Sequence, residues 1–344
     1  MQITTIGLDL AKSVFQVHCV DEHGHVVKRR KLRRGEVIGF FAALAPCLVG
    51  MEACGGAHYW ARRLAQFGHE VRLMPPQYVK PYVKTNKNDA RDAEAICEAV
   101  RRPAMRFVPV KSVEQQAVLS LHRARQGFVR ARTAQSNQLR GLLAEFGLVL
   151  PAGMAQIRGQ VVALVEGAQE LPACMRQLVG MLLENFKAID AKVKELERQI
   201  LDWHRASEAS RRLEAIPGIG PLGASALVAS IADASSFKSG RQLAAWLGLV
   251  PKQDSSGGKT RLLGMSKRGD TYLRTLLIHG ARSVIRAEQQ KKRPNPWLAS
   301  LLQRRNPNVA AVALANKNAR VLWALLVHDR PFRADYVSSP PLAG

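Results

Sequence analysis

The sequence predicts an α/β domain, then a long helical middle region, then a mainly α-helical C-terminal domain. Three observations predict this class: strand and helix patterns alternate over the first hundred residues, long helical periodicity follows, and glycine and proline then punctuate short helices. A length of 344 residues suits two or three domains. We place them at residues 1–110, 111–207 and 208–332, with a tail at 333–344 that we expect to be disordered.

The first domain reads as a sheet led by a hairpin, with helices on its faces. Residues 4–10, 14–21 and 24–32 predict an antiparallel meander of three strands. Two more apolar strands and three helices complete the unit, and Gly68 and Pro103 follow the last two helices as stop signals. The expected strands are 47–53 and 70–75, and the expected helices are 35–44, 57–68 and 88–102.

Four carboxylates stand out by their positions in this pattern. Asp9 lies inside the first apolar strand, and Glu52 ends the later strand "LVGME" just before two glycines. Asp89 and Asp92 are three residues apart, so they share a face of the helix that closes the unit. An Asp in an apolar strand is costly unless it is paired or bound to metal. Hard oxygen ligands of this kind suit two Mg²⁺ ions about 3.5–4 Å apart.

Weaker interpretations remain open for the individual acids. Asp89 could be a helix N-cap beside Asn88. Asp92 and Glu94 could form a solvated face, and Glu94 is turned away from Asp92 on the helix, so we leave it out of the predicted site.

The middle region predicts two long helices. The first runs from about Val113 to Gly147 and is rich in arginine, and the second spans residues 174–207. Apolar residues of the second recur at near-heptad spacing, as in a coiled coil within the chain or between subunits, although a plain amphipathic helix fits equally well. The predicted seam is Leu178, Met181 or Leu182, Ile189, Val193, Leu196 and Ile200.

The C-terminal domain holds two candidate nucleic-acid motifs. Pro217–Gly220, "PGIG", joins two helical patterns and resembles a helix-hairpin-helix, in which Gly218 and Gly220 leave backbone N–H groups open to a phosphate; an ordinary αα-turn is the alternative. The flexible loop "DSSGGK" follows and is not a Walker A motif. Cations around it predict phosphate contacts: Lys259, Arg261, Lys267, Arg268 and Arg274.

The composition indicates a polyanionic partner. There are 51 Lys and Arg against 27 Asp and Glu, a net charge of +24, which favours nucleic acid through counterion release. No basic amphipathic helix with aromatic anchors and no targeting segment is evident, so we expect no membrane association. The five cysteines form no CxxC pair, which suits a reducing cytoplasm, with the protein at the nucleoid.

The segments "GLDLAKSVFQV", "GMEACGGAHYW" and "NKNDARDAEAI" together resemble the N-terminal domain of the insertion sequence 110 family of transposases, including its 1111 subgroup. The resemblance continues into the C-terminal part. It implies an RNase H-like fold of the RuvC-like DEDD form, in which Asp9, Glu52, Asp89 and Asp92 are catalytic acids that bind Mg²⁺.

The same resemblance implies a serine nucleophile directly before a glycine in the loop, which Ser256 fits; the residues alone do not separate Ser256 from Ser255. It further implies a DNA recombinase of a mobile element, guided by a structured bridge RNA. Its site would combine the acids of one protomer with the serine of another in a dimer or tetramer.

Two other functions remain open at this point. A RuvC-like junction endonuclease would use the same acids to activate water and would need no serine. A non-catalytic nucleic-acid-binding protein would use the acids as caps and ion-pair partners, and its activity would not depend on Mg²⁺.

Overall fold

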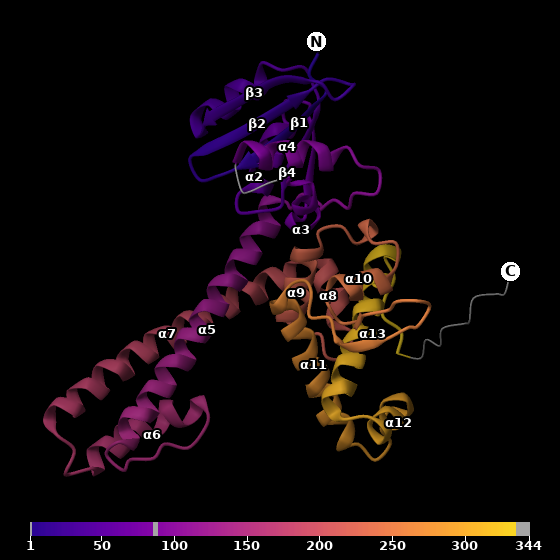
Figure 1. Cartoon of the computed structure of the whole chain (residues 1–344). Coiled ribbons are helices and arrows are strands. Elements are labelled where there is room, and N and C mark those ends of the chain that lie inside the picture. Colours follow the sequence, from indigo (N-terminus) through magenta and orange to yellow (C-terminus); the bar gives the residue numbers. More distant parts are fainter. Residues whose placement is uncertain (1, 85–88, 335–344) are drawn as a thin grey trace. The chain divides into compact units, whose positions relative to one another are not determined.

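A computed structural model of the chain describes residues 2–84 and 89–334 (Figure 1). These residues fold into two compact units. The first contains the chain up to Gln115 together with Ile231–Ser236, and the second contains Gln116–Ser230 and the chain from Phe237 onward. The predicted domain boundaries at 110, 207 and 332 remain predictions, and the expected disordered tail lies, from residue 335, outside the described residues.

The first unit is built on a five-stranded mixed sheet, as the strand patterns predict. The strand order is β3-β2-β1-β4-β5; β1, β2 and β3 pair antiparallel, and β4 is parallel to both β1 and β5. The predicted meander and the two later strands are therefore confirmed. The strands are β1 (Thr5–Leu10), β2 (Val14–Val20), β3 (Val26–Arg33), β4 (Leu48–Glu52) and β5 (Glu70–Met74).

Helices cover both faces of this sheet. On one face, Ile6 and Leu8 of β1 join a buried cluster with Phe41 of α1 and Trp60 of α2. On the other face, α4 buries Ile96 and neighbouring residues in a second cluster. The helices of this unit are α1 (Val37–Ala42), α2 (Ala57–Ala65), α3 (Pro76–Val79) and α4 (Asp89–Val100), with the 3₁₀ turns η1 (Arg34–Glu36) and η2 (Lys80–Tyr82).

Two glycines let α4 approach the sheet closely. Gly7 and Gly50 are direct partners in the β1–β4 ladder. A Cβ atom on Gly7 would lie 2.0 Å from the carbonyl oxygen of Ala93, and one on Gly50 would lie 2.7 Å from Cβ of Val100. Any side chain at Gly7 would therefore push α4 off the sheet, because backbone atoms already fill the space.

Two long helices of the second unit run antiparallel to each other (Figure 1). Arg125 binds Glu197 at 2.5 Å and Arg132 binds Asp190 at 2.6 Å, so residues later in α5 meet residues earlier in α7. The helices are α5 (Val113–Ala144) and α7 (Ala173–Ala206), as predicted, and α6 (Met154–Gly167), which the sequence reasoning missed.

The buried seam of α7 is displaced from the predicted one. Val193 and Ile200 are buried as expected, but Met181 is 63% exposed. Asp190 and His204 occupy seam positions because each has a polar partner. The Asp190 carboxylate accepts from Arg132 and Arg158, and the His204 ring is hydrogen-bonded to the Ser210 hydroxyl. Apolar periodicity alone misses such positions. The buried face is Val179, Leu183, Phe186, Asp190, Val193, Ile200 and His204.

The rest of the second unit is mainly helical, with one small hairpin. The C-terminal elements are α8 (Glu208–Glu214), α9 (Pro221–Ile231), η3 (Ala234–Ser236), α10 (Gly240–Trp246), β6 (Pro251–Gln253), β7 (Leu262–Met265), α11 (Thr271–Gln289), α12 (Pro296–Arg304) and α13 (Pro307–His328). By length and composition, α13 is the one helix in the described chain that passes as a membrane span, with 44% of its most apolar window buried. It packs on α10 and α11, as a core helix does.

Candidate active site

Strand alternation places Asp9 and Glu52 on the face of the sheet that α4 covers. Gly7 and Gly50 face α4 directly, and Asp9 and Glu52 each follow two residues later on the same strands. Successive side chains of a strand alternate between faces, so residues two apart share one. The close approach of α4 that the two glycines permit therefore brings its first turn over both acids.

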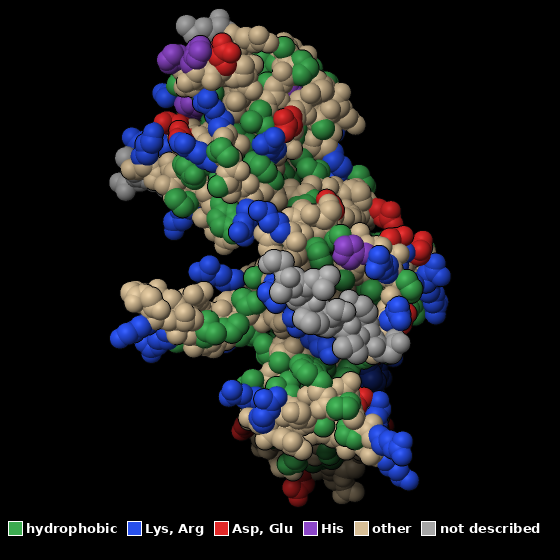
Figure 2. All heavy atoms as spheres, turned by 90° about the vertical axis from the view of Figure 1, so that its right-hand side faces the viewer, with side chains coloured by type: hydrophobic (Ala, Val, Ile, Leu, Met, Phe, Trp, Pro, Cys, Tyr) green, Lys and Arg blue, Asp and Glu red, His purple; other side chains and the backbone are tan. Residues whose placement is uncertain are grey.

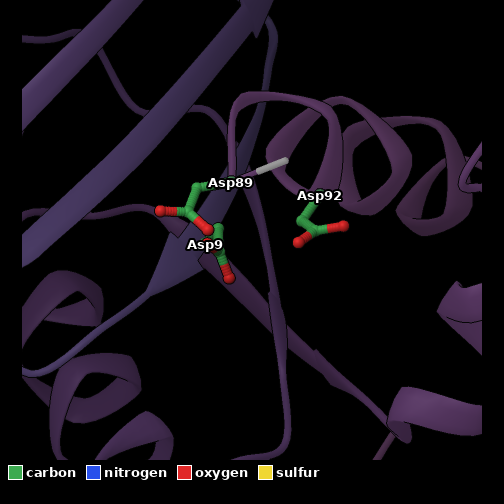
Figure 3. A group of neighbouring side chains, drawn as sticks. All are labelled: Asp9, Asp89 and Asp92. Carbon is green, nitrogen blue, oxygen red and sulfur yellow. The ribbon is translucent and has the colours of Figure 1, made fainter. Parts of the chain in front are cut away.

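Three aspartates meet at the start of α4. Asp9, Asp89 and Asp92 each offer a carboxylate oxygen, and these oxygens all lie within 4.8 Å of one another (Figure 3). Asp89 and Asp92 come from the first turn of the helix, and Asp9 comes from the end of β1. The predicted association of these three residues is therefore present in the structure.

Glu52 lies beside this group at the end of β4. It is half-buried, and burial, followed by the negative charges of Asp9 and Asp92, raises the pKa of its carboxyl above the usual value. Carboxylates gathered this closely favour either a shared proton or a bound cation.

Glu94 belongs to a different environment, in line with its exclusion from the predicted site. Its carboxylate lies 3.7 Å from Arg29 of β3 and 3.7 Å from Lys84. Both pairs are largely exposed, so Glu94 serves as a surface ion-pair partner.

Cys54 is a neighbour of the acids that the sequence reasoning missed. Burial and then the charges of Glu52 and Asp9 raise the pKa of its thiol. The thiol is therefore protonated at neutral pH, and it is not a ligand of the kind that a hard cation selects.

The donor set fits a divalent metal with hard-ligand preference. It offers carboxylate oxygens from two strands and one helix turn, and within the described residues the tight group contains no His or Cys. The matching chemistry is that of Mg²⁺ or Mn²⁺. A bound cation would offset the repulsion from Asp9 and Asp92, which adds to burial in raising the pKa of Glu52.

The serine loop is the tip of the β6–β7 hairpin. Gly257 and Gly258 both have positive φ, 55° and 76°, and the Lys259 N–H donates to the Ser256 carbonyl at 3.0 Å. Positive φ at both central positions defines a two-residue type I′ turn, for which glycine is well suited. Ser256 is thus the last residue before the turn, on an exposed tip.

The two serines differ in how their hydroxyls are used. Ser255 Oγ accepts a hydrogen bond across the hairpin stem from the Arg261 N–H at 3.2 Å, and another from Gln253 Nε2 on its own side at 3.0 Å. The described part of the chain holds no hydrogen-bond partner for the Ser256 hydroxyl. The Ser255 hydroxyl is therefore engaged within the hairpin, and the choice of Ser256 as the nucleophile remains a prediction.

The predicted nucleic-acid contacts fall into two groups. Lys259, Arg261, Lys267 and Arg268 are exposed around the hairpin. Arg274 has another role: it is 7% exposed, and its guanidinium donates to the carbonyl oxygens of Leu247 and Arg268. It holds the loop before α11 rather than facing solvent.

The "PGIG" turn joins α8 and α9 as predicted, and it also serves packing. Gly218 has φ +89°, and a Cβ on Gly280 of α11 would lie 1.7 Å from the Gly218 carbonyl oxygen. A Cβ on Gly220 would have no neighbour within 4 Å. Gly218 is therefore a packing position, and the phosphate-binding role of this turn remains a prediction.

Comparison with known proteins identifies the class. Residues 6–147 match the family DEDD_Tnp_IS110, described as "Transposase", and residues 210–295 match the family described as "Transposase IS116/IS110/IS902 family". A mixed α/β unit carrying a cluster of acids, with these two matches, defines a transposase, an enzyme that cleaves and transfers DNA strands by phosphoryl transfer. The first match also indicates an RNase H-like fold for the first unit.

The chain belongs to the IS116/IS110/IS902 family of transposases. It is 57% identical over 339 residues to a "Probable family 20 transposase" of Pseudomonas aeruginosa, covering 97% of this chain and 99% of that protein. It is 43% identical to the "Transposase for insertion sequence element IS1111A" of Coxiella burnetii, over 96% of this chain and 92% of that protein. A Yersinia enterocolitica protein, "Transposase for insertion sequence element IS1328", is 42% identical over 96% and 98% of the two chains.

Proposed function

We propose that this transposase cuts and rejoins DNA by attack of Ser256 on a phosphodiester, assisted by Mg²⁺ held by Asp9, Glu52, Asp89 and Asp92. The observation that carries the proposal is the convergence of Asp9, Asp89 and Asp92 within 4.8 Å, with Glu52 beside them at a raised pKa. The exposed Ser256 hydroxyl supports the nucleophile assignment.

The acids orient the DNA backbone. Asp9 and Glu52 lie on rigid strands, and Asp89 and Asp92 lie on a helix that Gly7 and Gly50 hold against the sheet, so the four oxygens keep a constant geometry. Divalent metal, when bound, neutralises charge on the scissile phosphate. We assign two ions to the site.

The serine supplies the nucleophile. The Ser256 oxygen bonds to phosphorus as its proton passes to solvent. The bond from phosphorus to the deoxyribose oxygen of the leaving strand then breaks, and that oxygen takes up a proton and leaves as a hydroxyl group. The phosphate ester on Ser256 keeps the bond energy needed for rejoining. Lys259 and Arg261, exposed beside the turn, are suited to stabilise the charge of this intermediate.

A junction endonuclease that activates water at the same acids is the second candidate. It is favoured by the raised pKa of Glu52, since a carboxyl of this kind can accept a proton from water. Its products would be free hydrolysed ends with no protein attached.

A labelled DNA substrate carrying the element ends separates the two. Incubation with Mg²⁺ and denaturing electrophoresis should show a covalent protein–DNA adduct for the wild type and for Ser255→Ala, and none for Ser256→Ala. Free hydrolysed ends from Ser256→Ala at the wild-type rate would reject the serine mechanism and favour water attack.

We further propose a guide RNA and an assembly of two or four copies at the nucleoid, in which the acids of one protomer work with the serine of another. Purification from the native host followed by sequencing of the bound nucleic acid tests the RNA. One discrete structured RNA supports it, whereas a mixture of host nucleic acid would mean that the +24 charge binds without selection. Mixing an Asp92→Asn protein with a Ser256→Ala protein tests the shared site, because only a composite site regains activity.

A further inference from the structure

The stretch from Gln289 to His328 contains cations but no acid. It holds seven Lys and Arg and no Asp or Glu across the end of α11, α12 and α13. All seven are exposed: Lys291, Lys292, Arg293, Arg304, Arg305, Lys317 and Arg320. Nearly all of the stretch lies beyond residue 295, where the second family match ends.

The one acid at its border is already engaged. Glu288 accepts from Lys291 Nζ at 2.5 Å and from the Asn295 N–H at 2.7 Å, which holds the loop between α11 and α12. The charges of Lys292 and Arg293 thus have no acid within the loop to neutralise them. Exposed, unneutralised cations of this density attract phosphate groups.

Helix α12 is anchored by hydrogen bonds at its ends, but the rest of the protein buries little of it. Asn295 caps it by accepting from the Leu298 N–H at 3.2 Å, and Leu298 is its one buried residue. Arg282 of α11 binds the Asn308 side chain of α13 at 2.9 Å, which ties together the helices on either side. Figure 1 shows α12 beside α13, and five of the nine residues of α12 are exposed. An anchored helix with an open surface is a suitable binding platform.

Trp297 adds an aromatic ring to this basic surface. It lies in the first turn of α12 and remains 41% exposed. Lys317 of α13 places its Nζ 4.5 Å from the ring centroid. We name the exposed cations on and beside α12, together with Trp297, the α12 patch; its members are Lys292, Arg293, Trp297, Arg304, Arg305 and Lys317. Figure 2 shows that Lys and Arg side chains outnumber acidic ones on the face it displays.

Cations alone are enough to bind a duplex, because its bases are stacked on one another and cannot stack on a side chain. An exposed ring beside cations is the combination that binds unpaired nucleotides, because any base can stack on the ring while its phosphates meet the cations. We infer that the α12 patch binds an unpaired stretch of nucleic acid, with a base stacked on Trp297 and the backbone on Arg304, Arg305 and Lys317. The inference rests on the proposed function only in that the chain acts on nucleic acid.

Fluorescence anisotropy with labelled 20-nucleotide strands tests the patch. Matched DNA and RNA strands and their blunt DNA duplex are titrated with the full chain in EDTA, so that neither metal nor the Ser256 reaction contributes. Trp297→Ala should weaken single-strand binding about 5-fold or more, Trp297→Phe should keep most of it, and duplex binding should change less than about 2-fold. A loss on RNA alone or on DNA alone would name the natural ligand, and a loss on both would support the shared chemistry.

Charge variants provide an independent measurement. Arg304→Gln/Arg305→Gln should make the negative slope of log affinity against log salt shallower by about 1.4 on single strands. The control Lys187→Gln/Arg205→Gln removes two exposed cations from α7 and should leave affinity near the wild-type value. Unchanged single-strand binding by both patch variants, or equal losses in the control, would overturn the inference. Because catalysis is absent from the assay, either result leaves the Ser256 mechanism to its own test.

Discussion

Gly7 of β1 lies against the backbone of Ala93 in α4, so closely that a Cβ on Gly7 would sit 2.0 Å from the Ala93 carbonyl oxygen. This contact sets the height of α4 above the sheet, and with it the distance from Asp9 to Asp92. The spacing of the acid cluster is therefore controlled by a residue that carries no functional group.

Gly7→Ala should separate α4 from the sheet. We expect a loss of about 1–3 kcal/mol in the free energy of unfolding and a fall in DNA cleavage of about 100-fold, because the acids would be displaced from their working geometry. Urea unfolding and a cleavage assay measure the two effects. Gly39→Ala is the matched control: Gly39 is exposed in α1 with open space around it, and this substitution should stabilise the fold by about 0.5–1 kcal/mol. Normal cleavage by Gly7→Ala would show that α4 tolerates displacement.

Divalent metal should stabilise the wild type through the acid cluster. Mg²⁺ or Mn²⁺ binds the folded state and so raises the melting temperature, and this rise should vanish in Asp9→Asn and Asp92→Asn. Cleavage should fall at least about 100-fold in both, since the metal contributes several kcal/mol to transition-state stabilisation. Glu94→Gln makes the same chemical change outside the cluster, where it loses exposed pairs with Arg29 and Lys84, and should keep the metal response. An intact response in Asp92→Asn would place the metal elsewhere.

Glu52→Gln should stabilise the metal-free protein at neutral pH while removing activity. The pKa of Glu52 is raised in the folded state, so its ionised form opposes folding. The penalty is absent below the unfolded value of about 4.3, grows as pH rises toward the folded pKa, and is constant above it. The difference in melting temperature between variant and wild type in EDTA should therefore be largest above neutral pH and shrink toward pH 4. A variant less stable than the wild type at pH 8 would contradict this sign.

The β6–β7 turn should depend on glycine through backbone conformation alone. Replacing Gly257 or Gly258 with Val forces a branched side chain into positive φ, which costs about 1–2 kcal/mol per residue and displaces Ser256. Gly257→Asn creates the Asn-Gly pair that is common in type I′ turns, so this variant should form most of the covalent adduct that the wild type forms. If Gly257→Val forms adduct as fast as Gly257→Asn, the turn geometry does not position the serine.

Asp190 is a buried carboxylate that should stabilise the packing of α5 and α6 on α7 through its ion pairs. Arg132 and Arg158 each lie 2.6 Å from this carboxylate and hold its pKa well below the usual range. Asp190→Asn should cost about 3 kcal/mol or more of unfolding free energy, because two arginines lose their partner. Asp202→Asn breaks exposed pairs on the same helix and should cost under about 1 kcal/mol. The stability from Asp190 is present above pH 4 and is lost only as pH falls through its lowered pKa.

The sequence by itself determined the strands, the order of the acids and the class of protein. Short apolar runs predict the central strands β1, β2 and β4, since a strand of a sheet covered on both faces buries most of its side chains, and Asp9 places a charge inside such a run. The heptad signal found α7 but placed its seam one residue off at Ile189, because Asp190 is buried only once Arg132 and Arg158 accompany it.

Only the tertiary structure decided which contacts residues of similar chemistry make. It separated Ser255 from Ser256 by a hydrogen bond across a hairpin stem, and it took Arg274 out of the basic surface by burying it against backbone carbonyls. It also placed Lys317 on the ring of Trp297, twenty residues away along the chain. Such pairings depend on how helices and strands pack, and packing joins residues that no local pattern relates.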